Sequence, residues 1–561
     1  HEPEAVARGD RLWGVAVQLY TLRSERNWGI GDFADLEVVV RRCAERRAAF
    51  VGLNPLHALF AANPAHFSPY SPSSRQFLNV LYIAVDRVPE FAACEEARRI
   101  ASEPAFAAEL ARLRSTGNVD YPGVAAVKMR VLRRLHRHFR ERSASSVYER
   151  AAAFRAYLAD QGEALQRHAV HEALDETLRV QDPACWGWPV WPVALRDPAS
   201  PDVAAFAAAH PGLVEFHAWL QWVADEQLAQ AQALARDLGM PIGLYGDCAV
   251  GVNPNGSETW SDQAVYRTGA AIGAPPDPLA LKGQDWGLLP QDPHTLLIER
   301  YRPFRDLVAA NMRHFGALRL DHVMALFRQW WVPSGLGATD GGYVHYPMAD
   351  LMAVLALESC RHRCLVVGED LGTVPDEVGA AMAERAIYSY KVMLFEKHGD
   401  GRFRRPGEYA RRAIATVTTH DLPTLRGYWE GGDMGLRDRL GLYPSEELRR
   451  YLHDERQRDR WALLGALEAE GLAGPAGPQI PAYSAELARA IQLYLARSSA
   501  ALVVLQVEDM VGMSDPVNVP STSEEHANWQ RKVMEGLETL FDREDVGRLM
   551  REVASARGEP A

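Results

Sequence analysis

Eight short runs of apolar and β-branched residues recur along the chain, and stretches with helical patterning separate most of them. Runs that are apolar on both faces are typical of strands buried inside a parallel sheet. Eight such strands alternating with helices predict an α/β fold, the (β/α)8 TIM barrel. The predicted strands cover residues 13–20, 49–55, 241–250, 317–322, 364–370, 390–396, 415–421 and 501–509.

Two of the intervening segments carry the spacing and end signals of helices. In 302–316 the apolar positions recur with helical periodicity, and Gly316 supplies a stop signal. Segment 350–363 is predicted to begin at Asp350 as its N-cap. It ends in basic residues, which suit the negative end of a helix.

Two gaps between predicted strands are too long for a single crossover, and both have helical patterning. We interpret them as largely helical insertions between strands 2 and 3 and between strands 7 and 8, above the C-terminal rim of the barrel. The Gly- and Pro-rich loop 251–295 is long for a plain connection and is predicted to act as a lid. The predicted division is 1–70, first part of the barrel; 71–235, first insertion; 236–421, barrel continued with the lid loop; 422–500, second insertion; 501–561, last strand and C-terminal helix.

Composition and charge narrow the class of partner. The chain has 561 residues and 47% hydrophobic content, which is ample for a large core. It carries 61 basic and 73 acidic residues, and the resulting net charge of −12 argues against nucleic acid or an anionic membrane as a partner. The sequence has no run of about 18 apolar residues that could span a bilayer.

The cysteines and the N-terminal sequence indicate the cellular compartment of the protein. The six cysteines are sparse, and the only close pair, Cys360 and Cys364, lacks the second pair that a structural zinc site needs. A reducing cytoplasm therefore fits best. The chain begins at His1 without the pattern of a secretory signal, and we expect that an upstream segment has been removed or left out.

The stretch "GALRLDHVM" (316–324) places charged residues inside a predicted strand. Because side chains alternate along a strand, Ala317, Arg319 and Asp321 share one face. Asp321 closes the strand, where barrel enzymes place catalytic groups. We expect Arg319 to orient Asp321 and to hold it ionised, although a buried ion pair without chemistry would have the same pattern.

Three further predicted strands end in carboxylates at the same rim. Such a residue can individually be an N-cap for the following helix, but four converging strands with an arginine and two histidines (His322 and His420) indicate a functional site. The carboxylates of these three strands are Asp247, Glu369 with Asp370, and Asp421 with His420.

Two carboxylates in unlike surroundings can divide the roles of nucleophile and acid. Asp321 beside Arg319 would be the ionised nucleophile, and Glu369, which follows an apolar strand, would be the proton donor and acceptor. That pairing is the arrangement of retaining glycosidases. Asp421 with His420 could hold sugar hydroxyls and stabilise a positive transition state.

Aromatic residues near these strands could stack on sugar rings. Tyr70 lies in "FSPYSPSS" (67–74) and Trp286 lies in "GQDWG" (283–287). Trp186, Trp188 and Trp191 in "CWGWPVWP" are better explained as core of the first insertion.

At these residues the chain resembles the amylomaltase family of bacterial 4-α-glucanotransferases, in its long form. The resemblance runs from about residue 13 to 532. Its marks are "QLYTLRSERNWGIGDF" (18–33), "NPAHFSPYSPSSRQFLN" (63–79), "GAPPDPLALKGQDWGLLPQDPH" (273–294), "GALRLDHVM" (316–324), "VVGEDLGTVP" (366–375) and "THDLPTLRGYW" (419–429).

The resemblance implies roles for individual residues. Asp321 falls at the family's nucleophile, Glu369 at its acid/base and Asp421 at its third carboxylate. The segment 273–287 matches a mobile loop that closes over glucan. Ser521 stands where the family usually has glycine, and the long-form relatives carry a β-rich N-terminal extension that this sequence lacks. Substrate contacts are implied for Tyr70, Asp247, Gln284, Trp286, Arg319, His322, His420 and Asn518.

The reaction implied by the resemblance is transfer of α-1,4-glucan segments in maltodextrin metabolism by retaining double displacement. Malto-oligosaccharides are the implied donors and acceptors, and glucose is a further acceptor. The family needs no metal and no organic cofactor, so none is expected. Transfer rather than hydrolysis requires that an acceptor outcompete water, which a closing aromatic loop would favour.

Other activities remain open from the residues alone. A retaining α-glucan hydrolase shares the carboxylates, and a metal-dependent barrel hydrolase could use the same Asp, Glu and His side chains. A Schiff-base lyase would need Lys391, which lies on a predicted strand but is better explained as the partner of a nearby carboxylate. A glucan-binding protein without activity has no need for the four rim carboxylates.

Overall fold

A closed barrel forms the centre of the molecule. The structure is a computed structural model, and it describes residues 1–143, 148–276, 282–372, 374–475, 477–520, 522 and 525–558. Neighbouring strands of the barrel are parallel and follow chain order, and the last pairs with the first. The predicted TIM barrel and its eight strands are therefore confirmed. The strands are β1 (Leu12–Val17), β2 (Phe50–Leu53), β5 (Gly243–Cys248), β8 (Ala317–Leu320), β11 (Leu365–Gly368), β12 (Tyr388–Val392), β13 (Ala413–Thr416) and β14 (Leu502–Gln506).

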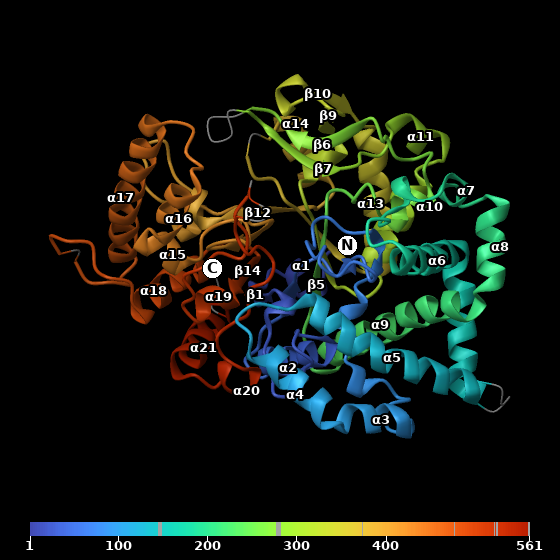
Figure 1. Cartoon of the computed structure of the whole chain (residues 1–561). Helices are drawn as coiled ribbons and strands as arrows, with labels where there is room; N and C mark the ends of the chain where they lie inside the picture. The colour runs from blue at the N-terminus through green and yellow to red at the C-terminus, as the bar shows by residue number, and fades with distance from the viewer. Residues whose placement is uncertain are drawn as a thin grey trace.

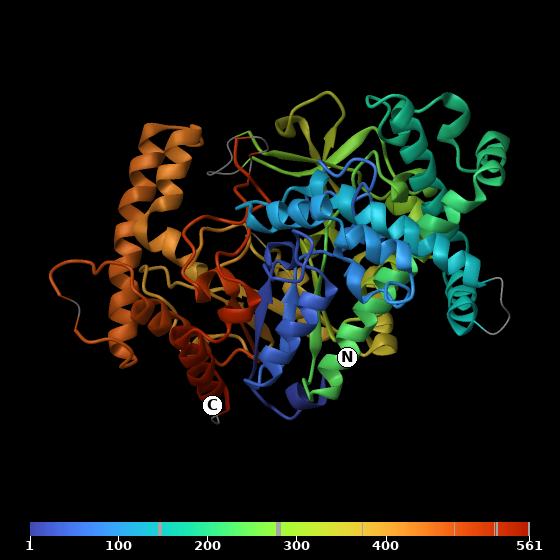
Figure 2. The same ribbon diagram turned by 60° about the horizontal axis from the view of Figure 1, so that its bottom comes forward.

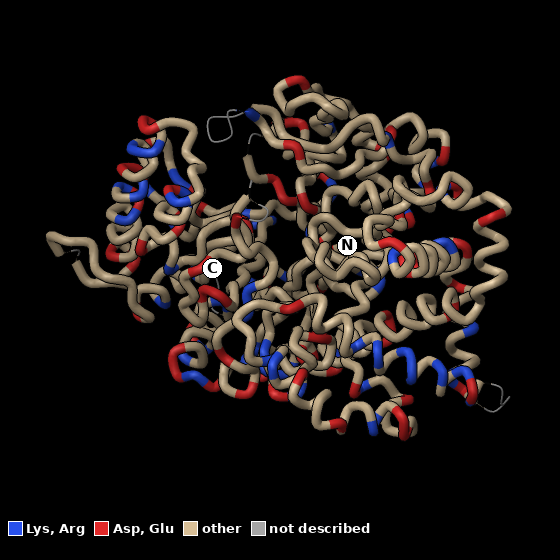
Figure 3. The backbone as a smooth tube through the Cα atoms, viewed as in Figure 1, with Lys and Arg blue, Asp and Glu red and all other residues tan. Residues whose placement is uncertain are grey.

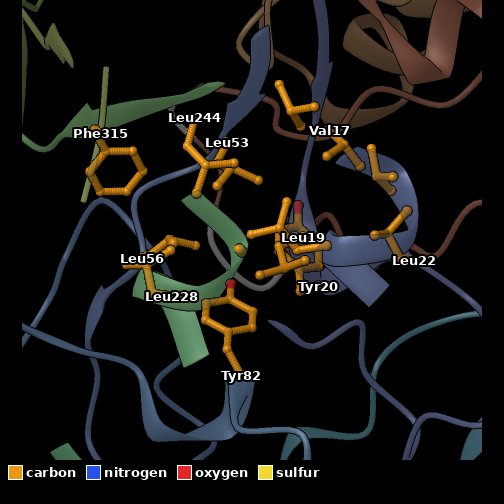
Figure 4. Close-up of a cluster of buried hydrophobic side chains, with 14 of the residues drawn as sticks. Val17, Leu19, Tyr20, Leu22, Leu53, Leu56, Tyr82, Leu228, Leu244 and Phe315 are labelled. Atoms are coloured by element: carbon orange, nitrogen blue, oxygen red, sulfur yellow. The ribbon is translucent and has the colours of Figure 1, made fainter. Parts of the chain in front are cut away.

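Helices cover the outside of the barrel and bury its outer face (Figure 1). The main core lies between these helices and the strands. In this core Leu53 at the end of β2 lies beside Leu244 of β5, and Leu228 of α9 and Tyr82 belong to the same cluster (Figure 4). The helices that contact barrel strands are α2 (Phe33–Ala44), α9 (Pro211–Asp237), α12 (Arg302–Met312), α14 (Asp376–Glu384), α18 (Ala485–Ala496), α19 (Val507–Met510) and α21 (Glu544–Gly558).

Two helix ends differ from the sequence prediction. The helix α12 ends at Met312, four residues before Gly316. The helix α13 spans Met348–His362, and Pro347 rather than Asp350 precedes it. Asp350 lies in the first turn, where its carboxylate accepts a hydrogen bond from the hydroxyl of Tyr301. The predicted N-cap was therefore wrong, because Asp350 is engaged by a tertiary contact.

The first insertion is largely helical, as predicted, and follows a short hairpin of β3 (His57–Ala58) and β4 (Ser74–Leu78). Trp191 is fully buried against Trp260 in a small separate core, which confirms its predicted core position. Trp186 and Trp188 are only partly buried. The helices are α3 (Glu95–Ser102), α4 (Pro104–Ser115), α5 (Tyr121–Ser143), α6 (Glu149–Gln181), α7 (Val193–Arg196) and α8 (Pro201–Ala209).

The second insertion forms a helical arm beside the barrel (Figures 1 and 2). It consists of α15 (Leu425–Glu430), α16 (Gly432–Leu440) and α17 (Glu446–Ala469). The helix α17 carries Arg intermixed with Asp and Glu, as a solvated helix does (Figure 3). The predicted boundaries between the parts of the chain remain predictions.

The predicted lid loop contains strands that the sequence analysis missed. The strands β6 (Ala270–Ala274) and β7 (Gln284–Leu288) pair with each other, and β6 also pairs with β9 (Arg328–Pro333). With β10 (Gly342–His345) they form an antiparallel sheet in the order β10-β9-β6-β7. Residues 277–281 of the predicted loop lie outside the described residues. The sequence analysis treated 251–295 as one lid loop without strands, and this was wrong where β6 and β7 lie.

Short helices complete the fold. Among the described residues, no helix is both long enough and apolar enough to cross a membrane. The short α-helices are α1 (Glu4–Ala7), α10 (Ser257–Ser261), α11 (Pro293–Ile298) and α20 (Leu537–Leu540). The 3-10 helices are η1 (Leu19–Thr21), η2 (Val80–Tyr82), η3 (Val85–Arg87), η4 (Trp188–Val190), η5 (Val323–Leu326), η6 (Ala338–Asp340), η7 (Met393–Phe395) and η8 (Pro406–Glu408).

Candidate active site

Arg319 joins two carboxylates at the rim of the barrel. It lies in β8 opposite Asp247 in the neighbouring strand β5, so that both side chains meet on one face. Its Nη1 donates to both carboxylate oxygens of Asp247, at 2.7 and 2.9 Å. Its Nη2 donates to Oδ1 of Asp321 at 2.7 Å. Arg319 and Asp247 are buried, and these bonds fix Asp321 just beyond the end of β8.

Asp321 is more easily protonated than the sequence analysis expected. Burial raises the pKa of Asp321, Arg319 lowers it, and the charges of Asp247 and Glu369 raise it again, which brings it to about 7. The expectation that Arg319 alone would hold Asp321 ionised was therefore wrong. The main physical reason is burial, and Asp247, which shares the same guanidinium, adds to it.

Glu369 follows β11 and is held by backbone groups. The N–H of His322 donates to Oε2 at 3.0 Å, and the N–H of Leu371 donates to Oε1 at 2.7 Å. The left-handed backbone of His322, with φ +48°, belongs to this turn. The preceding strand is apolar, but the carboxyl group itself is set among polar N–H donors. Its position is thereby tied to the turn that follows Asp321.

A second group of side chains continues from Asp247. The hydroxyl of Tyr70 donates to Oδ2 of Asp247 at 2.6 Å and lies 3.4 Å from Nδ1 of His420. The rings of Tyr70 and His420 stack with centroids 4.7 Å apart. Nε2 of His420 lies 3.1 Å from Oδ2 of Asp421, and the Asn518 amide donates to Oδ1 of Asp421 at 2.7 Å.

His420 and Asp421 stabilise each other as an ion pair. Burial alone would raise the pKa of Asp421, but the His420 charge and the hydrogen bonds from His420 and Asn518 lower it to about 2. Burial lowers the pKa of His420, but Asp421 outweighs burial and raises it overall. Asp421 therefore stays ionised, although its side chain is almost half exposed.

The predicted lid residues reach the same place. The ring of Trp286 in β7 meets the ring of His322 edge to face, with centroids 5.5 Å apart. The Nε1–H of Trp286 donates to Oε1 of Gln284 at 3.1 Å. Thus the structure brings together all eleven residues that the sequence analysis selected as catalytic or substrate-binding. The neighbouring Ser521 lies outside the described residues.

Asp370 and Lys391 face one another beside the site. Asp370 accepts hydrogen bonds from the hydroxyl of Ser389 and from the backbone N–H of Tyr390, the latter at 2.9 Å. Nζ of Lys391 lies 3.5 Å from Asp370. The prediction that Lys391 pairs with a nearby carboxylate is confirmed. The Asp370 carboxylate is hydrogen-bonded to residues of β12.

Two aromatic residues of the site were missed. Trp529 packs against Tyr70 and His420, with centroid distances of 5.2 and 5.6 Å. Tyr390 lies under the guanidinium of Arg319, 5.4 Å from its ring centroid. Tyr390 could have been found from its place in the predicted strand 390–396. Trp529 had no such signal, because it lies far from any barrel strand in sequence.

In the part of the chain that the structure describes, no group of three or more His, Cys, Asp and Glu is arranged to hold a metal ion.

Comparison with known proteins places the chain among glucan-transferring enzymes. The sequence model of the family described as 4-alpha-glucanotransferase matches residues 17–537. The 4-alpha-glucanotransferase of Haemophilus influenzae is 40% identical over 553 residues, which are 96% of this chain and 78% of that protein. The 4-alpha-glucanotransferase of Mycobacterium tuberculosis is 38% identical over 540 residues, 94% of this chain and 72% of that protein.

Two solved structures are similar in fold. The crystal structure of amylomaltase from Corynebacterium glutamicum matches with a TM-score of 0.86 at 33% identity, and covers 99% of this chain and 77% of that chain. Amylomaltase from Streptococcus agalactiae, solved in complex with acarbose, matches with a TM-score of 0.75 at 17% identity, over 98% of this chain and 100% of that one. The latter shows the likeness of the fold alone.

The raised pKa of Asp321 predicts a stability that depends on pH. A carboxyl group whose pKa is raised on folding favours the folded state at low pH, and this contribution is lost as the pH rises through about 7. Asp321→Asn should therefore stabilise the protein above pH 7 by up to about 4 kcal/mol, and the gain should vanish toward about pH 4. Denaturant unfolding of both proteins from pH 4.5 to 8 measures the difference.

Asp421→Asn is the matched control for this experiment. Because the pKa of Asp421 is lowered on folding, its ionised form contributes stability above about pH 4. The variant should lose stability at neutral pH instead of gaining it. A gain for Asp321→Asn that is the same at every pH would contradict the account.

Proposed function

The chain belongs to the 4-alpha-glucanotransferase family, and on that premise we propose that Asp321 is its nucleophile, Glu369 its acid and base, and Asp421 the carboxylate that stabilises the donor sugar. The protein is a 4-alpha-glucanotransferase, which moves α-1,4-glucan segments between malto-oligosaccharides. The observation that carries the assignment of roles is the Arg319 bridge, because it fixes one carboxylate of the cluster at the open end of β8.

The nucleophile needs an oxygen that is free to attack. Oδ1 of Asp321 accepts the hydrogen bond from Arg319, and no described residue donates to Oδ2. Oδ2 can therefore form a bond to the anomeric carbon of the donor while the glycosidic C–O bond breaks. The positive charge that develops on the sugar favours the ionised form of Asp321, which offsets the repulsion among the carboxylates.

Glu369 supplies and recovers one proton. In the first step its proton goes to the glycosidic oxygen of the leaving sugar. In the second step it takes the proton of the acceptor 4-hydroxyl, whose oxygen bonds to the anomeric carbon as the ester bond to Asp321 breaks. The N–H groups of His322 and Leu371 hold the carboxyl group in place for both steps.

Asp421 is suited to a role that does not change its charge. Its pKa is lowered by His420 and Asn518, so it remains ionised while Asp321 and Glu369 exchange bonds and protons. An ionised carboxylate beside the donor can accept hydrogen bonds from sugar hydroxyls and stabilise the oxocarbenium-like transition state. Tyr70, Asp247 and His420 extend this polar surface, and we assign them to the donor side.

The lid strand β7 would favour transfer over hydrolysis. Trp286 lies against His322, which directly follows the nucleophile. An indole stacked on sugar at this point would exclude water from the glycosyl ester until an acceptor binds. Gln284, which holds the Trp286 Nε1–H, would fix the orientation of that ring. The same cluster in a hydrolase would lack this protection.

The finer identity of partners and compartment is also part of the proposal. We propose malto-oligosaccharides as donors and acceptors, with glucose as a further acceptor and no metal or organic cofactor. A related amylomaltase was solved with acarbose, which supports an oligosaccharide site on this fold. All six cysteines are unpaired, and this supports a reducing compartment such as the cytoplasm.

Removal of the nucleophile should stop both transfer and hydrolysis. Asp321→Asn cannot form the glycosyl ester, so kcat/KM for maltotriose disproportionation should fall by more than about a thousandfold. Product analysis by chromatography at equal concentrations of folded protein measures the loss. Turnover within about tenfold of the parent, a barrier change of only about 1.4 kcal/mol, would show that the nucleophile is another residue.

Removal of the acid should leave the first step intact for an activated donor. In Glu369→Gln, α-maltosyl fluoride should still glycosylate Asp321, because fluoride leaves without protonation. Mass spectrometry should then detect a trapped glycosyl adduct on the peptide that contains Asp321. Asp370→Asn is the control and should leave transfer at least about a hundred times higher than Glu369→Gln does. If the two variants exchange these properties, Asp370 is the acid.

Removal of the lid indole should increase the share of hydrolysis. Trp286→Ala should raise the ratio of new reducing ends to transferred products several-fold, because stacking of this kind contributes about 0.5–1.5 kcal/mol. Trp330→Ala is the matched control, since Trp330 lies in β9 of the same sheet and binds the carbonyl of Ala338. An unchanged ratio in Trp286→Ala, or an equal rise in Trp330→Ala, would show that the indole is not the barrier to water.

A further inference from the structure

The loop between β13 and α15 carries two residues of the site. It spans 417–424, and His420 and Asp421 lie in its middle. The amide of Asn518 and the ring of Tyr70 contact these two residues from one side. The loop itself contains little regular hydrogen bonding, and within it Leu422 N–H donates to the carbonyl of Thr419. Its shape must therefore be set largely by contacts outside it.

One buried carboxylate joins the two ends of this loop. Asp509 lies in α19, just after β14, and is 2% exposed. Its Oδ2 accepts a hydrogen bond from the hydroxyl of Thr418 at the start of the loop. Its Oδ1 accepts from the backbone N–H of Leu425 at the end, at 2.6 Å. The two oxygens of a single carboxylate thus span the segment that presents His420 and Asp421.

Neighbouring polar groups support the first end. Thr416 Oγ1 donates to the carbonyl of Thr418 at 2.8 Å. Nε2 of Gln506, the last residue of β14, lies 3.3 Å from Thr416 Oγ1 and 3.4 Å from the carbonyl of Thr418. Thr416 is the last residue of β13 and Gln506 is the last residue of β14, so the ends of these two neighbouring strands support the start of the loop.

Burial of the Asp509 carboxylate lowers the stability of the folded protein. Among the described residues no Lys, Arg or His lies within ion-pair distance of it, and burial raises its pKa to about 7. A buried carboxylate without a cation at ion-pair distance costs stability, which the hydrogen bonds from Thr418 and Leu425 offset only in part. Such costs are typical of residues retained for function rather than for the fold.

We propose that Asp509 is a positioning residue for the transfer reaction, which holds loop 417–424 so that Asp421 reaches the donor sugar. The proposal rests on the role proposed above for Asp421. It deepens that role by naming the group that sets the place of the third carboxylate. Asp509 touches neither substrate nor the reacting atoms and acts through Thr418 and Leu425.

Two variants disrupt the hydrogen bonds between Asp509 and the loop, one at the acceptor and one at the donor. Asp509→Asn replaces one acceptor oxygen by an NH2 group, which can no longer accept the hydrogen bond from the hydroxyl of Thr418 or from the backbone N–H of Leu425. Thr418→Val removes the donor hydroxyl and keeps the shape of the side chain. Each should lower kcat/KM for maltotriose about tenfold to hundredfold, because displacement by an ångström costs about that much, and kcat should fall more than KM rises. The kcat/KM of the double variant should be no more than about threefold below that of the less active single variant.

Controls separate positioning from general loss of structure. Thr418→Ser keeps the hydroxyl and should retain activity within about threefold. Asp175 is another buried carboxylate, which accepts the N–H of Gly187 in the first insertion at 3.0 Å. Asp175→Asn should change Tm but leave kcat/KM within about threefold. Activities are compared at equal concentrations of folded protein, and Tm is measured for each variant.

Three outcomes would overturn the proposal. They are full activity in Asp509→Asn and Thr418→Val, losses that multiply in the double variant, and an equal loss in Asp175→Asn. Asp421→Asn distinguishes this failure from failure of the proposed function. If Asp421→Asn is fully active, the role of Asp421 is wrong. If Asp421→Asn is inactive while Asp509→Asn is fully active, only the positioning role is wrong.

Discussion

The site depends on one guanidinium that two carboxylates share. Arg319 bonds to both oxygens of Asp247 and to one oxygen of Asp321 across neighbouring strands of the barrel. From Asp247 the contacts continue through Tyr70 to His420 and Asp421. Asp321 and Asp421, the proposed nucleophile and third carboxylate, are therefore parts of one connected polar chain. Parallel pairing of β5 with β8 makes this possible, because it places Asp247 opposite Arg319.

The ionised form of Asp321 lowers the stability of the folded protein, but it is the form that the proposed reaction needs. Burial raises the pKa of Asp321, Arg319 lowers it, and the charges of Asp247 and Glu369 raise it again, to about 7. On the proposed roles, the positive charge that develops on the donor sugar offsets this cost, so the site is more complementary to the transition state than to the free enzyme. Arg319 holds Asp247 and Asp321 in place, and backbone N–H groups hold Glu369.

The sequence predicted the barrel well for a physical reason. Strands of a parallel barrel are buried on both faces, so their apolar runs stand out, and catalytic groups follow at their ends. The four strands β6, β7, β9 and β10 were not recognised, because one face of their sheet is exposed and glycines and prolines interrupt the pattern. The ionisation of Asp321 could not be predicted, because it depends on how Asp247 shares Arg319. Trp529 and Asp509 were missed because their contacts are distant in sequence.

The central claim is that Asp247 competes with Asp321 for Arg319. The pH dependence of kcat/KM in the free enzyme tests it most directly, because its acidic limb reports the carboxylate cluster. In Asp247→Asn the guanidinium faces Asp321 alone and one negative charge is gone, so the acidic limb should move to lower pH than in the parent. An acidic limb at the same pH in both proteins, or at higher pH in the variant, would contradict the account.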